Sequence, residues 1–432
     1  MNHNTKIMKR LSLICGLLLL TNVVSSQTLD ECRKLARERY PEIKQYDLIA
    51  QARHYNLSNA AKAWIPQVQL SGQATYQSAT LSYPDAFDAM MQANGIEMSG
   101  ISKEQYKIAI DVSQQIWDGG KSKAERSIAD TEAEEQQRRV DVSLYELQSK
   151  IDNIYFGILL LDERRRESKA LIAMLESNLN RMRSYYKNGV AMQSDVDIIE
   201  AELLTARQAL GQIESSRTSY RRMLELFIGQ PLTADRLERP AEVSVASRTS
   251  ARPELNLFNA QENRLEAQRK AINSSVMPRF SAFAQGYYGY PGLNMFKSMT
   301  STEWSLNAIV GVRMSWNIGA LYTRKNNLDK IDIAQRQIAT GREVFLFNTA
   351  LQMTQDDGEI ERLRKAVEDD GRIVELRQRV RKAAESQLEN GVIDATDLLR
   401  KITEETTAIQ SRSTHEIELL QAIYRLKTTL NQ

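Results

Sequence analysis

Four segments of the chain alternate between apolar and polar residues, three of them strictly. They are residues 67–77, 105–117, 279–290 and 303–317. A period of two over ten or more residues predicts a β-strand with one apolar and one polar face. The segment 279–290 follows the pattern least well, because Phe283 and Tyr287 fall on its polar side.

The lengths of these predicted strands match the 9–11 residues that a tilted strand needs to cross a bilayer. A half-buried sheet of a soluble sandwich would alternate in the same way. However, only four such strands occur, as two hairpins at 67–117 and 279–317 that are separated by a long helical region. An open sheet edge is not tolerated in lipid, so several chains must close one barrel. Three copies would give twelve strands and two copies eight.

The segments after the hairpins predict long helices with coiled-coil character. Apolar residues step by four and three along the first: Val140, Leu144, Leu147, Ile151, Ile154, Ile158 and Leu161. Such a heptad seam, flanked by charged residues, is typical of a coiled coil. Residues 121–187 correspond to a helix of about 100 Å, and 195–228 form a shorter returning helix. The second half repeats this plan at 320–389 and 397–430, and helices over 41–65 and 253–277 precede the hairpins.

The chain contains two copies of one unit. Tyr40-Pro41-Glu42 recurs as Arg252-Pro253-Glu254, and Asn188-Gly189-Val190 recurs as Asn390-Gly391-Val392. The landmarks follow the same order in both halves, which indicates an internal repeat. We therefore predict a first repeat over residues 27–228 and a second over 252–432, joined by a connector at 229–251.

The turns between the long helices, at 188–194 and 390–396, are candidate functional sites. Gly189 and Gly391 are expected to supply the left-handed residue that ends each long helix. Ser194, with Asp197 three residues later, predicts a capping box for the returning helix, and Thr396 takes the equivalent place. Asp195 and Asp397 are either first-turn acids that face a positive helix end or carboxylates that form a ring in a symmetric oligomer.

The first 26 residues read as a secretory signal peptide. A cationic start with Lys6, Lys9 and Arg10 is followed by the apolar run 11–20 and a plausible cleavage point after Ser26. The apolar run is shorter than the roughly 20 residues of a membrane-spanning helix. Export then leaves Cys32 as the only cysteine, so the mature chain makes no internal disulfide.

Composition excludes several classes of function. The 432 residues carry 57 Lys+Arg against 55 Asp+Glu, without the basic excess of a nucleic-acid-binding protein. Two cysteines and three histidines leave little for metal or His-based chemistry, and no P-loop, dinucleotide fingerprint or nucleophile elbow occurs. His54 and His415 are interpreted as solvated helix residues and Cys32 as a packed one. We predict neither an enzyme nor a cofactor or metal site.

The ordered set of repeats and Asn-Gly-Val turns resembles the TolC family of outer-membrane efflux channels over essentially the whole mature chain. The resemblance implies a mainly α-helical subunit with a small membrane sheet. Three subunits would form a 12-stranded β-barrel in the bacterial outer membrane and an α-helical barrel in the periplasm. It also implies a passive exit duct of a tripartite efflux or type I secretion system, without catalysis. The alternative is an exported coiled-coil structural protein or adhesin without channel activity.

The resemblance also implies partners and sites. The partners would be a periplasmic adaptor (membrane fusion) protein, an inner-membrane pump or ABC transporter, and outer-membrane lipid. The tip turns Asn188–Val190 and Asn390–Val392 would dock the adaptor. Asp195 and Asp397 would line the entrance constriction. Arg400 stands where the family has a second carboxylate, so a mixed ring of Asp397 and Arg400 is expected to lock the closed entrance through ion pairs between subunits.

Overall fold

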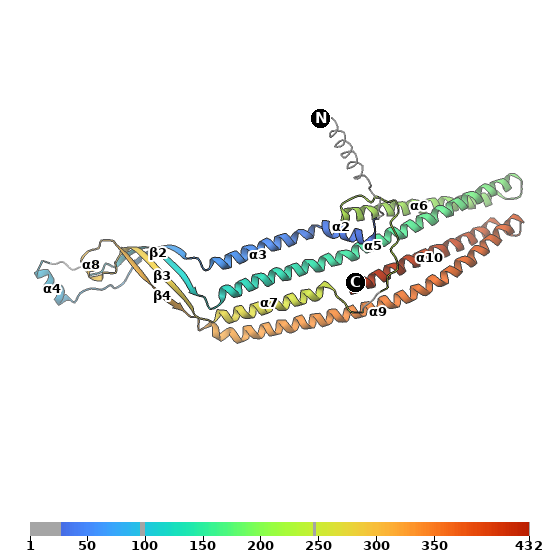
Figure 1. Cartoon of the computed structure of the whole chain (residues 1–432). Coiled ribbons are helices and arrows are strands. Elements are labelled where there is room, and N and C mark those ends of the chain that lie inside the picture. Colours follow the sequence, from blue (N-terminus) through green and yellow to red (C-terminus); the bar gives the residue numbers. More distant parts are fainter. Residues whose placement is uncertain (1–26, 96–99, 245–247, 432) are drawn as a thin grey trace, which may run out of the picture. The chain divides into compact units, whose positions relative to one another are not determined.

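A computed structural model describes residues 27–95, 100–244 and 248–431 of the chain (Figure 1). The predicted signal peptide, residues 1–26, lies outside the described residues. The helices and strands are α2 (Leu29–Arg39), the 3₁₀ helix η1 (Pro41–Lys44), α3 (Gln45–Lys62), β1 (Gln67–Tyr76), α4 (Asp85–Ala93), β2 (Glu104–Trp117), α5 (Lys121–Lys187), α6 (Gln193–Ile228), α7 (Pro253–Ser275), β3 (Arg279–Tyr290), α8 (Met295–Thr300), β4 (Ser305–Ser315), α9 (Ala320–Glu389) and α10 (Ala395–Leu430). The predicted fold class is confirmed in its main feature: a mainly α-helical chain with a small antiparallel sheet.

The described residues form two compact units. One lies within Met1–Gln45, Arg139–Asn256 and Arg342–Gln432, and we call it the hairpin unit. The other lies within Tyr46–Arg138 and Leu257–Gly341, and we call it the sheet unit. Each unit takes residues from both predicted repeats. Over the described residues, no helix combines the length and apolar character needed to cross a membrane.

The sheet unit contains four antiparallel strands in the order β1-β2-β3-β4. Even-numbered residues pair with even-numbered residues across the strands, as in Val68 opposite Val112 and Ala284 opposite Val310. All four predicted strands are therefore present, and their apolar positions lie on one face of the sheet. The two hairpin connections carry the short helices α4 and α8 (Figure 1), which the alternation pattern did not predict.

The loops at this end of the sheet are fixed by a buried tyrosine. The hydroxyl of Tyr290 accepts a hydrogen bond from the Ser102 N–H at 3.0 Å and donates one to the Ser298 carbonyl at 2.8 Å. Tyr290 also packs with Ile101 and Met299 in a small apolar cluster. The two hairpin connections, which are far apart in sequence, thus contact each other.

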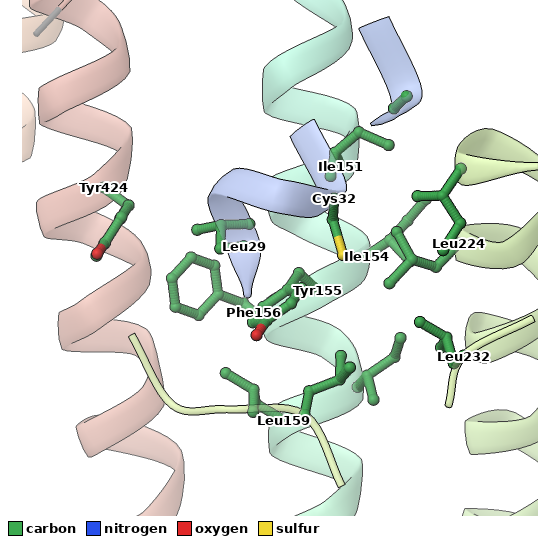
Figure 2. Close-up of a cluster of buried hydrophobic side chains, with 14 of the residues drawn as sticks. Leu29, Cys32, Ile151, Ile154, Tyr155, Phe156, Leu159, Leu224, Leu232 and Tyr424 are labelled. Carbon is green, nitrogen blue, oxygen red and sulfur yellow. The ribbon is translucent and has the colours of Figure 1, made fainter. Parts of the chain in front are cut away.

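The hairpin unit has its largest apolar cluster where α2 packs against α5, α6 and α10 (Figure 2). Cys32 is wholly buried there, and burial raises the pKa of its thiol to about 12. The prediction of a packed rather than reactive cysteine is confirmed. Tyr155 is also wholly buried, and its hydroxyl donates to the Glu238 carbonyl at 2.7 Å. Complete burial of a large apolar side chain contributes about 1.5–3 kcal/mol, so this cluster is a main source of stability.

The connector 229–251 contacts both helix pairs of the hairpin unit. Leu232 and Leu237 lie in the apolar cluster just described. Asp235 contacts Arg165 of α5 at 2.8 Å. Further ion pairs join the connector to α9 and α10: Glu242 to Arg364 at 2.7 Å and Arg239 to Glu416 at 3.1 Å. The connector therefore holds the two repeats together within this unit.

Several local predictions were inexact. The helix predicted over 41–65 is a 3₁₀ turn, Pro41–Lys44, followed by α3. The preceding helix α2 was missed, although Thr28 and Glu31 form a capping box at its start. His415 is not simply solvated, because its Nδ1 lies 2.6 Å from the carboxylate of Asp370.

Candidate functional site

Within the described residues, no other part of the chain covers most of the apolar face of the sheet. Its side chains are strongly exposed, with Leu306 at 82% and Val310 at 78%. On the opposite face, Ala109 and Tyr287 are buried. Contiguous exposed apolar surface of this kind marks an interface with a membrane or with another protein.

Aromatic residues border this apolar face at both ends. At the loop end, Trp304 stacks on Tyr106 and lies against Tyr288, with ring centroids 6.1 and 5.3 Å apart. At the helix end, Trp117 lies against Phe280 at 5.9 Å. Tyr106 and Trp117 are eleven residue steps apart on β2, or about 36 Å along the strand. A tilt near 45° reduces this to about 25 Å, the height of the apolar band between aromatic girdles in membrane strands.

The polar face carries a hydrogen-bonded network instead. The ammonium group of Lys107 donates to Gln285 Oε1 at 3.0 Å, and the Gln285 amide donates to the carboxylate of Asp111. Phe283 and Tyr287, which broke the polar pattern in the sequence, serve as partners for cations. The Lys107 ammonium lies 4.5 Å from the centre of the Tyr287 ring, and the Arg313 guanidinium lies 4.7 Å from that of Phe283. Such cation–π contacts explain how aromatic residues fit on this face.

The sheet has two unpaired edges. Within the described chain, β1 pairs only with β2, and β4 pairs only with β3. Each outer edge therefore presents a row of backbone N–H and C=O groups that can pair with another strand. An edge of this kind is a template for association between chains.

The tip turns have the predicted glycine geometry. Gly189 and Gly391 adopt positive φ angles of 72° and 69°, and nothing lies within 4 Å of where a Cβ would be on either. Val190 and Val392 follow directly and are 75% and 68% exposed. Two equivalent turns in one chain thus present an apolar side chain to the surroundings.

The helix caps at the tips differ from the prediction. Helix α6 begins at Gln193, and the carboxylate of Asp195 accepts a hydrogen bond from the Met192 N–H at 2.9 Å. Helix α10 is capped by Asp394, whose carboxylate accepts from the Asp397 N–H at 2.8 Å. Ser194 and Thr396 are therefore not the capping residues, because both helices begin before them.

The candidate constriction residues lie in the first turns of α6 and α10. The carboxylate of Asp195 caps the N-terminus of its own helix, α6, by accepting the hydrogen bond from the Met192 N–H. The carboxylate of Asp397 accepts a hydrogen bond at 2.8 Å from Arg400 of the same chain, and both side chains are substantially exposed. Within one chain, Asp397 and Arg400 thus form a neutralised pair on the helix surface. An ion pair between subunits requires Arg400 to exchange this partner.

The two tips are packed together within the hairpin unit. One apolar cluster joins Leu179 of α5 and Val196 of α6 to Ala395 of α10. A second cluster joins Leu398 and Ile402 of α10 to Ala384 of α9, with Leu171 of α5 packed against it. These contacts hold the two tip turns in a fixed relation to each other. Among the residues with described positions, no group of three or more His, Cys, Asp or Glu side chains is arranged to hold a metal ion.

Comparison with known proteins shows which family part of the chain is similar to. Residues 32–230 match the model of the outer membrane efflux protein family. A search of curated proteins finds no significant match.

Solved structures match over nearly the whole chain. The Vibrio cholerae outer membrane protein VceC aligns with a TM-score of 0.66 and 14% identity, covering 93% of this chain and 95% of that one. The Campylobacter jejuni outer membrane channel CmeC gives 0.67 and 11%, covering 93% and 85%. The open state of the Neisseria gonorrhoeae outer membrane channel MtrE gives 0.64 and 15%, covering 94% and 89%.

The fold of the chain is thus the fold of outer-membrane channel proteins. The small antiparallel sheet and the long helices of this chain match those structures. Residues 32–230 match the outer membrane efflux protein family, in agreement with the family resemblance predicted from the sequence.

Proposed function

We propose that this chain is the exit duct of a tripartite efflux or secretion system in the bacterial outer membrane. Three identical subunits would form the duct, and an inner-membrane transporter would supply the energy. The observation that carries the proposal is the four-stranded sheet with an exposed apolar face between aromatic rows and two unpaired edges. The match of residues 32–230 to the outer membrane efflux protein family supports a role as a channel rather than an enzyme.

Closure between subunits follows from the two sheet edges. In lipid, an unpaired backbone N–H or C=O costs several kcal/mol, so a lone sheet of four strands is unstable there. Pairing of β4 in one subunit with β1 of the next satisfies both edges at once. Two or three copies would satisfy this requirement, and the family resemblance favours three, which gives a barrel of twelve strands.

The tip turns are proposed as the docking site of a periplasmic adaptor. Three subunits would present six turns, each with an exposed valine beside a glycine. An apolar side chain at the exposed end of a helical hairpin suits a contact with another helical hairpin. Asp195, Asp397 and Arg400 lie in the adjoining first helical turns, where we propose that they line the entrance to the duct.

Conductance in a planar lipid bilayer tests the channel proposal directly. The detergent-purified mature protein is expected to insert and to give discrete, long-lived conductance steps. An exported coiled-coil structural protein or adhesin would fractionate without detergent and pass no ions. That outcome would remove the channel proposal.

Adaptor docking is tested by substitution of the exposed tip valines. Val190→Asp together with Val392→Asp places charges where an apolar contact is proposed, and should abolish co-purification with an adaptor encoded beside this chain. Val344→Asp is the matched control, because Val344 on α9 is also exposed but lies outside both turns. Equal binding by the tip variant and the control would show that the adaptor docks elsewhere.

A further inference from the structure

The polar face of the sheet carries an excess of positive charge. Three of its side chains are cationic: Lys107 on β2, Arg279 on β3 and Arg313 on β4. Only Asp111 is acidic on this face within the four described strands. The remaining acid in the strands, Glu104, begins β2 and alternates onto the apolar side at the loop end. The polar face therefore has three positive charges against one negative charge.

The three cations are not neutralised by ion pairs. Within the described residues, no carboxylate lies at ion-pair distance from any of them. Lys107 donates instead to the neutral amide of Gln285 and lies over Tyr287, and Arg313 lies over Phe283. An aromatic ring holds a cation in place without cancelling its charge. The face thus keeps its positive charge, while contacts with Gln285, Tyr287 and Phe283 hold the Lys107 and Arg313 side chains in place.

The charges are spread along the strands rather than gathered at one end. The register orders them from the loop end to the helix end as Lys107, Asp111, Arg313 and Arg279. The single acid thus lies between cations, and its carboxylate already accepts a hydrogen bond from Gln285. A solute moving along this face would meet a cation above and below the only acid.

We propose that this face lines the outer-membrane part of the duct as an anion-attracting surface, and that the substrates carry acidic groups. This inference rests on the proposed channel function, since the polar face is a lining only if several sheets close around a pore. Rings of Arg and Lys favour anions in pores, and rings of Asp and Glu favour cations. Three subunits multiply the excess of two positive charges per chain to six in one water-filled passage, which raises the local concentration of anions.

The test is the reversal potential of the reconstituted channel in a gradient of potassium chloride. Lys107→Gln, Arg279→Gln and Arg313→Gln together remove the cations and leave Asp111, so the face changes from net positive to net negative. The permeability ratio of potassium to chloride should rise at least about twofold. Asp111→Asn should move the ratio in the opposite direction. The charge-retaining triple variant Lys107→Arg, Arg279→Lys and Arg313→Lys is the control and should behave as the parent protein.

The possible outcomes separate the two proposals. Absence of any conductance in the parent protein would remove the proposed channel function. Conductance with a permeability ratio unchanged in both the triple Gln variant and Asp111→Asn would overturn the anion-attracting lining and leave the channel standing. If the triple Gln variant does not insert, Asp111→Asn alone decides, because its single neutral substitution keeps the shape of the side chain.

Discussion

The bidentate ion pair between Arg33 and Asp152 allows a quantitative prediction about the hairpin unit. Arg33 of α2 donates from Nε and Nη2 to the two carboxylate oxygens of Asp152 on α5, both at 2.7 Å. Both side chains are largely buried. The Arg33 guanidinium also lies over the aromatic ring of Tyr424 on α10, 5.6 Å from the ring centre. The pair therefore lies where three helices meet.

Removal of only the cation should lower the free energy of unfolding strongly. Arg33→Met keeps the apolar part of the side chain but leaves the Asp152 carboxylate buried without a cation. Breaking a buried pair in this way costs about 3–5 kcal/mol, because the remaining charge is neither solvated nor paired. Replacement of both partners, by Arg33→Met and Asp152→Leu, removes both charges and should be neutral or stabilising by about 1–4 kcal/mol.

The pKa of Asp152 supports this reasoning and adds a pH dependence. Burial raises its pKa above the usual range even though the Arg33 hydrogen bonds oppose the shift. A raised pKa in the folded state means that the ionised form destabilises the fold at higher pH. Loss of Arg33 removes the opposing effect, so the cost of Arg33→Met should be largest at neutral pH. It should shrink as the pH falls through the folded-state pKa and Asp152 takes up a proton.

The assay is urea unfolding in detergent, followed by the helical circular dichroism signal at neutral and mildly acidic pH. Asp30→Asn serves as the control, because Asp30 also contacts Arg33 but is 77% exposed, and its loss should cost less than about 1 kcal/mol. If the double variant is as unstable as Arg33→Met alone, the cost does not come from an unpaired charge and the reasoning fails.

Three further predictions concern the sheet, the connector and the tips. Gly289→Ala should weaken the β2–β3 pairing and lower the yield of folded protein in the membrane fraction, because the alanine Cβ would lie 2.3 Å from the Tyr106 carbonyl oxygen. Gly286→Ala is the control and should leave the yield unchanged, because no atom lies within 4 Å of its added Cβ. The hydrogen bond from Arg165 lowers the pKa of Asp235, so the anchoring of the connector is present above the unfolded-state pKa and is lost as the pH falls through the lower folded-state value. The protection factor for amide hydrogen exchange near residue 235, which corrects for the slower intrinsic exchange in acid, should therefore fall in acid in the parent protein and be insensitive to acid in Asp235→Asn. Asp394→Ala should destabilise the start of α10 by about 0.5–2 kcal/mol, measured by the same unfolding assay, with Thr396→Ala as a near-neutral control.

Much of the fold could be predicted from the sequence because its patterns are local and long. Alternation over 10–14 residues, strict in β1, β2 and β4, predicts each strand and its face without reference to other parts of the chain. The heptad steps and the Asn-Gly turns defined α5 and α9 closely, since glycine is the residue that accepts the positive φ found at Gly189 and Gly391. The short helices α4 and α8 have too few turns to show a period, and they were missed.

The site was less accessible to sequence reasoning, because its contacts join residues far apart in the chain. Phe283 and Tyr287 interrupt the polar pattern of β3 in the sequence, whereas in the structure Arg313 and Lys107 from the neighbouring strands lie over their rings. The cap at the first tip was misplaced because serine is a preferred capping residue, whereas Asp195 reaches back to the Met192 N–H and starts the helix earlier. A list of charged positions on the predicted polar faces would have revealed the cationic excess.

Disulfide cross-linking between the outer strands tests the central claim most directly. One cysteine is placed on β1 at Ser71 and a second on β4 at successive positions from Ser305 to Ser315, in chains whose native Cys32 is wholly buried. Pairing of β4 with β1 of a neighbouring subunit predicts that some registers give a ladder of one, two and three linked chains in membranes, and none beyond three. A protein that stays monomeric at every register under oxidising conditions would contradict closure of the duct by identical subunits.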